Sequence, residues 1–106
     1  MSALAITAGR RNKRVPTVPT MMESGIPDYD TNAWGTMMAP AGTPEAIRNK
    51  ISAAIIEIYK KPEMLKTFAD QGADAVSSTP AETAAFVKRE GELWGAVVKA
   101  GNVKIS

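Results

Sequence analysis

Two short Thr-Pro segments, each opening a charged and periodic stretch, constrain the fold of this chain most. Residues 43–45 read Thr-Pro-Glu, and residues 79–82 read Thr-Pro-Ala-Glu. A threonine supplies a side-chain cap for a helix, a proline suits the first helical position, and an early glutamate suits the positive end of the helix dipole. Both segments therefore predict helix starts, with a side-chain cap from each threonine, and the second has the pattern of a full capping box.

Each predicted start is followed by sequence with helical periodicity. After the first start, apolar residues recur along one face and predict a helix that packs against a sheet. Pro62 ends this helix and opens a second one, which stops at Gly72. The third predicted helix runs from about Pro80 to Ala100. The inward faces of the first and third helices are expected to be formed by Ile47, Ile51, Ala54, Ile55, Ile58, Phe86, Val87, Leu93, Trp94, Val97 and Val98.

Three short apolar runs predict strands. Residues 3–8 form a continuous apolar run with a β-branched centre, which Gly9 ends. Residues 33–39 form the second candidate, and Gly35 within it suggests a bulge or a close backbone approach. Residues 73–78 form the third, with weak alternation. Together with the helices, these runs predict an α/β fold with crossover connections.

The segment between the first two predicted strands contains turns and a basic run. Thr20 and Glu23 have the spacing of a capping box and Gly25 supplies a stop, so one or two helical turns are expected there. Residues 10–14 hold four cations in five positions. A solvated loop is the favoured interpretation, because the alternative, a phosphate-contacting patch, lacks interleaved aromatic residues and an adjacent basic helix. We therefore expect no nucleic-acid partner.

The composition excludes several classes of chemistry. The chain has 106 residues, 44% of them hydrophobic and 23% charged, with a formal net charge of +2, which fits one small domain or part of a larger one. It contains no Cys and no His, which excludes thiol nucleophiles, disulfides, nearly all zinc and haem sites and the usual general base near neutral pH. We expect no cofactor and no metal site. No apolar stretch reaches the ~18 residues needed to span a bilayer.

Candidate reactive groups are few. Asp28 and Asp30 flank Tyr29, and carboxylates two apart in an extended turn can point the same way, as a paired-acid site requires. Stabilisation of a turn by Asx-type hydrogen bonds is the more common role of such residues. Ser24 has no histidine to activate it, so no catalytic residue is assigned. Trp34 is open to two interpretations, packing in the interior or lining of a cleft wall.

Three stretches of the chain together resemble a known family. They read LAITAGRR near the start, VPTMMESGIPDYDTNAWGTMMAPAGTPEAI in the middle and QGADAVSSTPAETAAFVKREGELWGAVVKAGNVKI at the end. The middle stretch carries the most recognisable pattern, with a Val-Pro-Thr turn, Glu23, Gly25, a tyrosine, Trp34 before a glycine, and Ala-Pro-Ala-Gly-Thr-Pro at 39–44. In this order and spacing the sequence resembles the substrate-binding receptors of tripartite tricarboxylate transporters, also called the Bordetella uptake gene family.

This resemblance implies a fold and a domain organisation. Members of the family are two-lobed, flytrap-like proteins of the type II periplasmic-binding-protein class, in which short strands and packed helices form α/β lobes. By this resemblance, residues 1–106 are the C-terminal portion of a two-lobed solute-binding protein. Residues 1–35 are then the segment that crosses at the hinge, and residues 36–106 are the C-terminal part of the first lobe.

The resemblance also implies a function. The family captures small carboxylates, such as di- and tricarboxylates, acidic amino acids or aromatic acids, and delivers them to membrane permease subunits. The implied protein is periplasmic and is not an enzyme, and its signal peptide is expected to lie outside this sequence. The residues that match positions near the cleft, and are therefore expected to contact the ligand, are Thr7, Ala8, Gly9, Trp34 and Gly35.

Two other functions stay open at the level of the sequence. One is a small α/β enzyme fragment that uses Asp28, Asp30 or lysine side chains. The other is a structural domain that self-associates, because a piece of a lobe exposes sheet edges and apolar surface through which two copies can form a homodimer. The main anion-binding loops of the family match nothing in this sequence, so the chain alone is expected to bind citrate or glutamate weakly or not at all.

Overall fold

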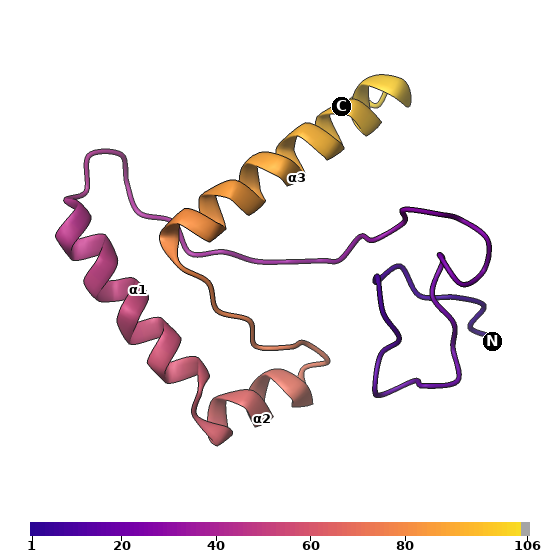
Figure 1. The fold of residues 1–106 in the computed structure, drawn as a ribbon, viewed down its shortest axis with the longest axis horizontal. Helices are drawn as coiled ribbons and strands as arrows, with labels where there is room; N and C mark the ends of the chain where they lie inside the picture. Colours follow the sequence, from indigo (N-terminus) through magenta and orange to yellow (C-terminus); the bar gives the residue numbers. More distant parts are fainter. Residues whose placement is uncertain (105–106) are drawn as a thin grey trace. The chain divides into compact units, whose positions relative to one another are not determined.

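The computed structural model describes residues 1–104 and contains in them three α-helices (Figure 1). Helix α1 spans Glu45–Tyr59, α2 spans Pro62–Asp70 and α3 spans Pro80–Ala100. The chain divides into two compact units, Met1–Thr36 and Met37–Ser106, and all three helices belong to the second. None of the described helices combines the length and the apolar composition that crossing a membrane requires.

The expected α/β fold is wrong for the described residues, which are 43% helix and 2% strand and contain no sheet. Of the three predicted strands, residues 3–8 contribute one isolated parallel bridge, between Ile6 and Thr20, while residues 33–39 and 73–78 form no strand. An apolar, β-branched pattern indicates backbone that can extend. Extended backbone becomes a strand only when another segment supplies hydrogen-bond partners along its length. In the described part of the chain, the bridge is limited to a single pair of residues.

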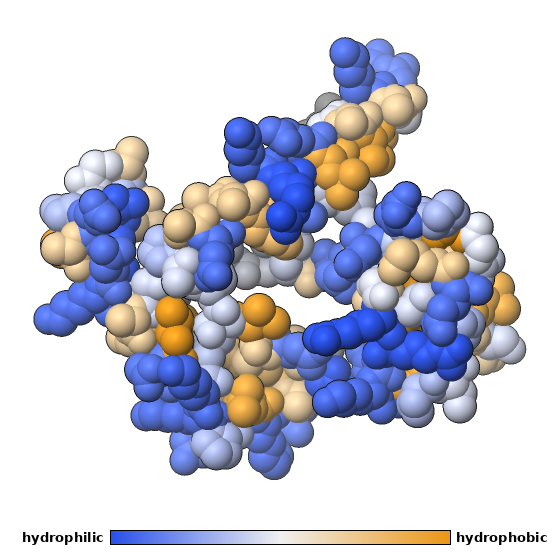
Figure 2. Space-filling model, viewed as in Figure 1, coloured by the Kyte–Doolittle hydropathy of each residue, from blue (hydrophilic) through white to orange (hydrophobic). Residues whose placement is uncertain are grey.

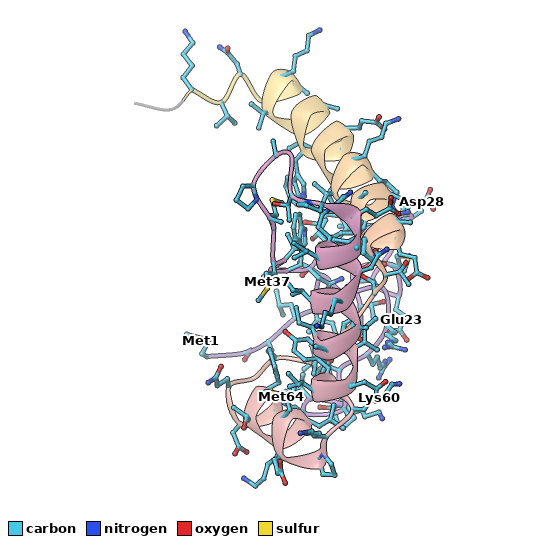
Figure 3. The ribbon with its side chains drawn as sticks, turned by 90° about the vertical axis from the view of Figure 1, so that its left-hand side faces the viewer. Met1, Glu23, Asp28, Met37, Lys60 and Met64 are labelled. Atoms are coloured by element: carbon cyan, nitrogen blue, oxygen red, sulfur yellow. The ribbon has the colours of Figure 1, made fainter. Side chains whose placement is uncertain are left out.

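Helices α1 and α2 form where the sequence predicts them. Helix α1 ends at Tyr59, with Lys60 as its C-cap, and Pro62 then begins α2. Because a proline has no N–H to donate to the preceding turn, it starts a new helix and does not continue α1. The rings of Tyr59 and Phe68 lie 5.3 Å apart and join the two helices. Figure 3 shows Lys60 at this junction, with Met64 in the first part of α2.

The residues that flank these helices agree with the predictions in one case and differ in the other. Gly72 follows α2 with φ of +76°, a left-handed conformation that favours glycine, which confirms the predicted stop. Before α1, the expected side-chain cap by Thr43 is wrong, because Pro44 occupies the cap position and no side chain caps the helix. The Thr43 hydroxyl instead donates to the carbonyl oxygen of Pro40 at 2.8 Å. It closes a turn that also contains Gly42, with φ of +83°, and is not available to α1.

Helix α3 begins with the predicted capping box. The Thr79 hydroxyl accepts from the N–H of Glu82 at 3.3 Å, and Glu82 Oε2 accepts from the N–H of Thr79 at 2.8 Å. Pro80 occupies the first helical position, where the missing N–H costs no intrahelical bond. The backbone N–H of Thr79, and then its hydroxyl, hold the pKa of Glu82 below its ordinary value. The predicted start and end of this helix, Pro80 and Ala100, are both confirmed.

The apolar faces of the helices are not enclosed within residues 1–104, where no hydrophobic side chain is buried. Ile47 of α1 is 50% exposed and Val97 of α3 is 48% exposed. Figure 2 shows apolar side chains at the surface along α3, beside hydrophilic ones. The expectations that the α1 stripe packs against a sheet and that the α3 stripe faces inward are therefore wrong. The physical reason is that the described part of the chain supplies no sheet to cover them.

Candidate functional site

The first unit is organised around a buried threonine. Thr20 is 3% exposed and is the only buried residue among those that the structure describes. Its hydroxyl accepts from the N–H of Glu23 at 3.1 Å, and Glu23 Oε2 accepts from the N–H of Thr20 at 2.8 Å (Glu23 is labelled in Figure 3). The predicted capping box is thus confirmed, although residues 21–25 form a turn and not a helix. Gly25, with φ of +99°, ends the turn as expected.

Arg11 connects the basic loop to this turn. Its Nε donates to both carboxylate oxygens of Glu23, at 3.1 and 3.0 Å, and its Nη1 donates to the carbonyl oxygen of Pro16 at 3.1 Å. The hydrogen bond from Arg11, followed by that from the Thr20 N–H, lowers the pKa of Glu23 to about 2. The same carboxylate raises the pKa of Arg11. One cation of the basic run therefore has an internal structural role.

A second connection joins the end of the apolar N-terminal run to a later turn. The N–H of Gly9 donates to Asp30 Oδ1 at 2.8 Å. The N–H of Thr31 donates to the carbonyl oxygen of Thr7 at 2.9 Å. These two bonds run in opposite directions between neighbouring residues, so they hold the two segments side by side.

The two aspartates that flank Tyr29 have different local roles. The Asp30 carboxylate accepts from two neutral donors, the Gly9 N–H and the side-chain amide of Asn32, the latter at 3.1 Å. Asp28 adopts φ of +58°, a left-handed conformation that aspartate visits more readily than most residues. Because Asp30 is engaged in these bonds, the interpretation of the two carboxylates as a catalytic acid pair gains no support.

The five residues expected to contact a ligand all lie in the first unit. Three are consecutive, and two of these, Thr7 and Gly9, make the hydrogen bonds just described, with Ala8 between them. Trp34 is 43% exposed, and an added Cβ at Gly35 would meet open space. Contact between these residues and a ligand stays a prediction.

The sequence alone does not indicate two side chains that organise this unit. A basic run is typical of a solvated loop, and two aspartates in a turn are typical of local Asx bonding. Arg11 and Asp30 instead have partners 12 and 21 positions away. The available signal was a glycine directly after an apolar run, as Gly9 is, because such a glycine indicates close approach by another group.

The chemistry that this unit offers is hydrogen bonding. Main-chain N–H groups, hydroxyls and an indole are donors that suit a carboxylate. In residues 1–104 there is no grouping of three or more acidic, His or Cys side chains that could hold a metal. The full sequence contains no His and no Cys, so the usual pairs of a nucleophile and an imidazole base are excluded.

Comparison with known proteins identifies a family. The family described as "Tripartite tricarboxylate transporter family receptor" matches residues 1–103. The chain is 35% identical over 105 residues to Protein BugT of Bordetella pertussis, which covers 99% of this chain and 32% of BugT. It is 37% identical over 84 residues to a UPF0065 protein in the TAR-I ttuE-ttuC' intergenic region of Agrobacterium vitis, with 79% of this chain and 24% of that protein covered. A UPF0065 protein in the tcbD-tcbE intergenic region of a Pseudomonas species is 29% identical over 93 residues, covering 87% of this chain and 28% of that protein.

These matches have two consequences. The chain spans about a third of the length of BugT and about a quarter of the length of the Agrobacterium protein. The family match includes nearly the whole of the sequence and both compact units, and it confirms the resemblance carried by the three stretches. This chain therefore belongs to the receptor family of the tripartite tricarboxylate transporters.

Proposed function

We propose that this chain acts as the C-terminal portion of a solute-binding receptor, which captures a small carboxylate in the periplasm and delivers it to the membrane subunits of a tripartite tricarboxylate transporter. The observation that carries the proposal is the family match across residues 1–103. Because that match includes both compact units, the proposal applies to the whole chain and not to a single motif. Similarity to BugT over 99% of the chain supports it.

The division of the chain into two units supports separate roles for them. The boundary after Thr36 lies next to the boundary expected at residue 35. In the proposed receptor, residues 1–35 form the segment that crosses at the hinge, and residues 36–106 belong to the first lobe. A segment made of turns, and held by a limited number of main-chain and side-chain bonds such as those of Ile6 and Arg11, can change its backbone angles at the points between these bonds. Hinge closure around a ligand requires this property.

The proposed ligand is a di- or tricarboxylate, an acidic amino acid or an aromatic acid. Proteins bind such carboxylates with main-chain N–H groups, hydroxyls and ordered water. Capture of a solute requires no nucleophile and no general base, which agrees with a sequence that lacks Cys and His. The residues proposed to line the ligand are Thr7, Ala8, Gly9, Trp34 and Gly35.

Measurements of uptake test this function. A strain from which the gene has been deleted is compared with the same strain carrying the gene on a plasmid, and labelled citrate, glutamate and benzoate represent the three ligand classes. We expect uptake of at least one of these acids to fall on deletion and to return with the plasmid. Equal uptake of all three acids by both strains would contradict the proposed function. Cell fractionation tests the location separately, because the chain is expected in the periplasmic fraction.

A second candidate function is self-association through an exposed apolar face of α3. This face, called the α3 face below, is formed by Leu93, Trp94, Val97 and Val98, all of them exposed large hydrophobic residues. Contiguous apolar surface on a soluble protein is often an interaction site. A homodimer in which α3 packs against α3 would remove this surface from water. The dependence of molecular mass on concentration distinguishes this function from a purely monomeric receptor portion.

A further inference from the structure

Gly9 and Asp30 are 21 positions apart in the sequence and are in close contact. The N–H of Gly9 lies 2.8 Å from Asp30 Oδ1. A Cβ added to Gly9 would lie 2.6 Å from Asp30 Oδ2 and 2.8 Å from Asp30 Cγ, which are distances that real Cβ atoms essentially never show. The carboxylate therefore lies directly against the glycine backbone. A side chain at position 9 would therefore require the Asp30 carboxylate to move from this position.

The bonds around this contact connect two segments. Asp30 Oδ1 accepts from the neutral amides of Gly9 and Asn32, and a hydrogen bond to an ionised carboxylate is roughly twice as strong as one between neutral groups. The next residue, Thr31, donates its N–H to the carbonyl oxygen of Thr7 at 2.9 Å. Asp30 thus adds a side-chain bond directly beside a main-chain bond. The pair fixes the spacing between the two segments.

Ile6, which precedes Thr7 in the N-terminal segment, is also held by main-chain hydrogen bonds. The N–H of Ile6 donates to the carbonyl oxygen of Pro19 at 2.9 Å, and the carbonyl oxygen of Ile6 accepts from the N–H of Met21 at 2.9 Å. Residues 6–9 are therefore anchored at both ends, by main-chain bonds at Ile6 and by Asp30 at Gly9. Two anchors this close together leave the intervening backbone little freedom.

We propose that Asp30 is a positioning residue of the ligand site, which fixes the main chain of Thr7–Gly9 relative to the segment that leads to Trp34. This inference rests on the proposed function, which puts a ligand at these residues. The N–H of Gly9 is already bonded to Asp30, so Gly9 contributes by the placement of its neighbours and does not donate to the ligand. An alternative is a blocking role, in which Asp30 takes the place of a ligand carboxylate. We favour positioning, because a blocking role would not explain the adjacent bond from the Thr31 N–H to Thr7.

Hydrogen exchange of backbone amides, measured by NMR on the chain, tests the positioning without a ligand. Asp30→Ala removes the acceptor, Asp30→Asn keeps an acceptor oxygen, and Asp28→Asn is the matched control for a lost charge. We expect Asp30→Ala to speed exchange of both the Gly9 and the Thr31 amides by about tenfold, Asp30→Asn to have a much smaller effect and Asp28→Asn to have none. An unchanged rate for Thr31 in Asp30→Ala would overturn the proposal, because Asp30 would then act on Gly9 alone.

A titration with citrate, glutamate and benzoate tests the link to binding, with the amide signals of residues 7–9 and the indole signal of Trp34 as readouts. We expect the affinity for a bound acid to fall about fivefold in Asp30→Ala and in Gly9→Ala, and to be retained in Asp30→Asn. A rise in affinity would identify Asp30 as a blocking group and would overturn the proposal. If no acid shifts a signal in the wild-type chain, this agrees with the weak binding expected of a chain that spans about a third of BugT, and the exchange rates alone then decide whether Asp30 positions the segment. The helical circular dichroism of each variant reports that the second unit stays folded.

Discussion

The Nε atom of Arg11 lies within hydrogen-bond distance of both carboxylate oxygens of Glu23, at 3.1 and 3.0 Å. The same arginine reaches the carbonyl oxygen of Pro16, so one side chain connects the basic loop to the turn that begins at Thr20. Both side chains of the pair are about half exposed, with relative exposures of 47% and 46%. Ion pairs of this kind are screened by salt and contribute little individually. The order of the first unit is nevertheless expected to respond to the charge of Glu23.

The stability of the first unit is expected to fall as the pH drops from about 4.5 to about 2. The hydrogen bond from Arg11, and then that from Thr20, lower the pKa of Glu23 from 4.5 to about 2. A carboxylate with a lowered pKa stabilises the folded form above its ordinary pKa, and this contribution is lost as the pH falls toward the folded-state value. The protection factor of the Thr20 amide, measured across this range, reports the change.

Two variants and a control examine the same carboxylate. Glu23→Gln is expected to remove the acid dependence of Thr20 protection, and Arg11→Gln is expected to raise the pKa of Glu23 toward 4.5. Glu92→Gln, which removes a carboxylate from α3, should leave Thr20 unaffected. A Glu23 pKa that stays near 2 in Arg11→Gln, read from the NMR shift of the carboxyl carbon, would contradict the role given to Arg11.

Removal of the Thr79 hydroxyl is expected to destabilise α3 more than removal of the Thr43 hydroxyl destabilises α1. Thr79→Ala loses the cap, which costs about 1 kcal/mol of helix stability. Thr43→Ala leaves the start of α1 unchanged, because the Thr43 hydroxyl bonds to Pro40. Thermal melting followed by circular dichroism measures both, with Thr79→Ser as the control that retains a hydroxyl. Equal losses in the two alanine variants would be inconsistent with the caps as assigned.

The chain is expected to self-associate through the α3 face as its concentration rises. Leu93→Lys should weaken this association, because the interface would have to bury a charge. Glu92→Gln makes the same change in net charge on the opposite, polar side of the helix, and should have no effect. Sedimentation at two concentrations measures the association. A wild-type chain that stays strictly monomeric at the higher concentration would rule it out.

Calorimetry of the chain by itself with citrate or glutamate is expected to show weak binding or none. The chain spans about a third of the length of BugT. A ligand held in a closed cleft loses most of its contacts when part of the cleft wall is missing. Binding with micromolar affinity would show instead that these residues form a complete site.

The helix boundaries could be predicted because the groups that determine them are local. Thr79 and Glu82 complete the cap of α3 within one turn, and the same pattern at Thr20 and Glu23 forms the box of the first unit. Pro62 separates α1 from α2 by its own covalent structure. Each of these signals depends only on residues that are close in the sequence, so it can be recognised in a single sequence.

The strands and the connections of the candidate site could not be predicted, because they depend on distant partners. The extended backbone at residues 3–8 forms one bridge, from Ile6 to Thr20, and residues 33–39 form no strand in the described part of the chain. The bond between Gly9 and Asp30 spans 21 positions and has no local pattern. The family could be identified without these contacts, because the resemblance depends on the order of motifs along the chain and not on their geometry.

Thr20 is the most enclosed residue that the structure describes, and no apolar side chain in residues 1–104 is removed from water to the same degree. The heat capacity of a protein rises on unfolding mainly because apolar surface becomes hydrated. Melting of this chain alone should therefore be gradual, with a heat-capacity step well below the ~12–15 cal/mol/K per residue of ordinary globular domains. We expect a sharp, cooperative unfolding transition only when a partner surface buries the apolar faces of α1 and α3.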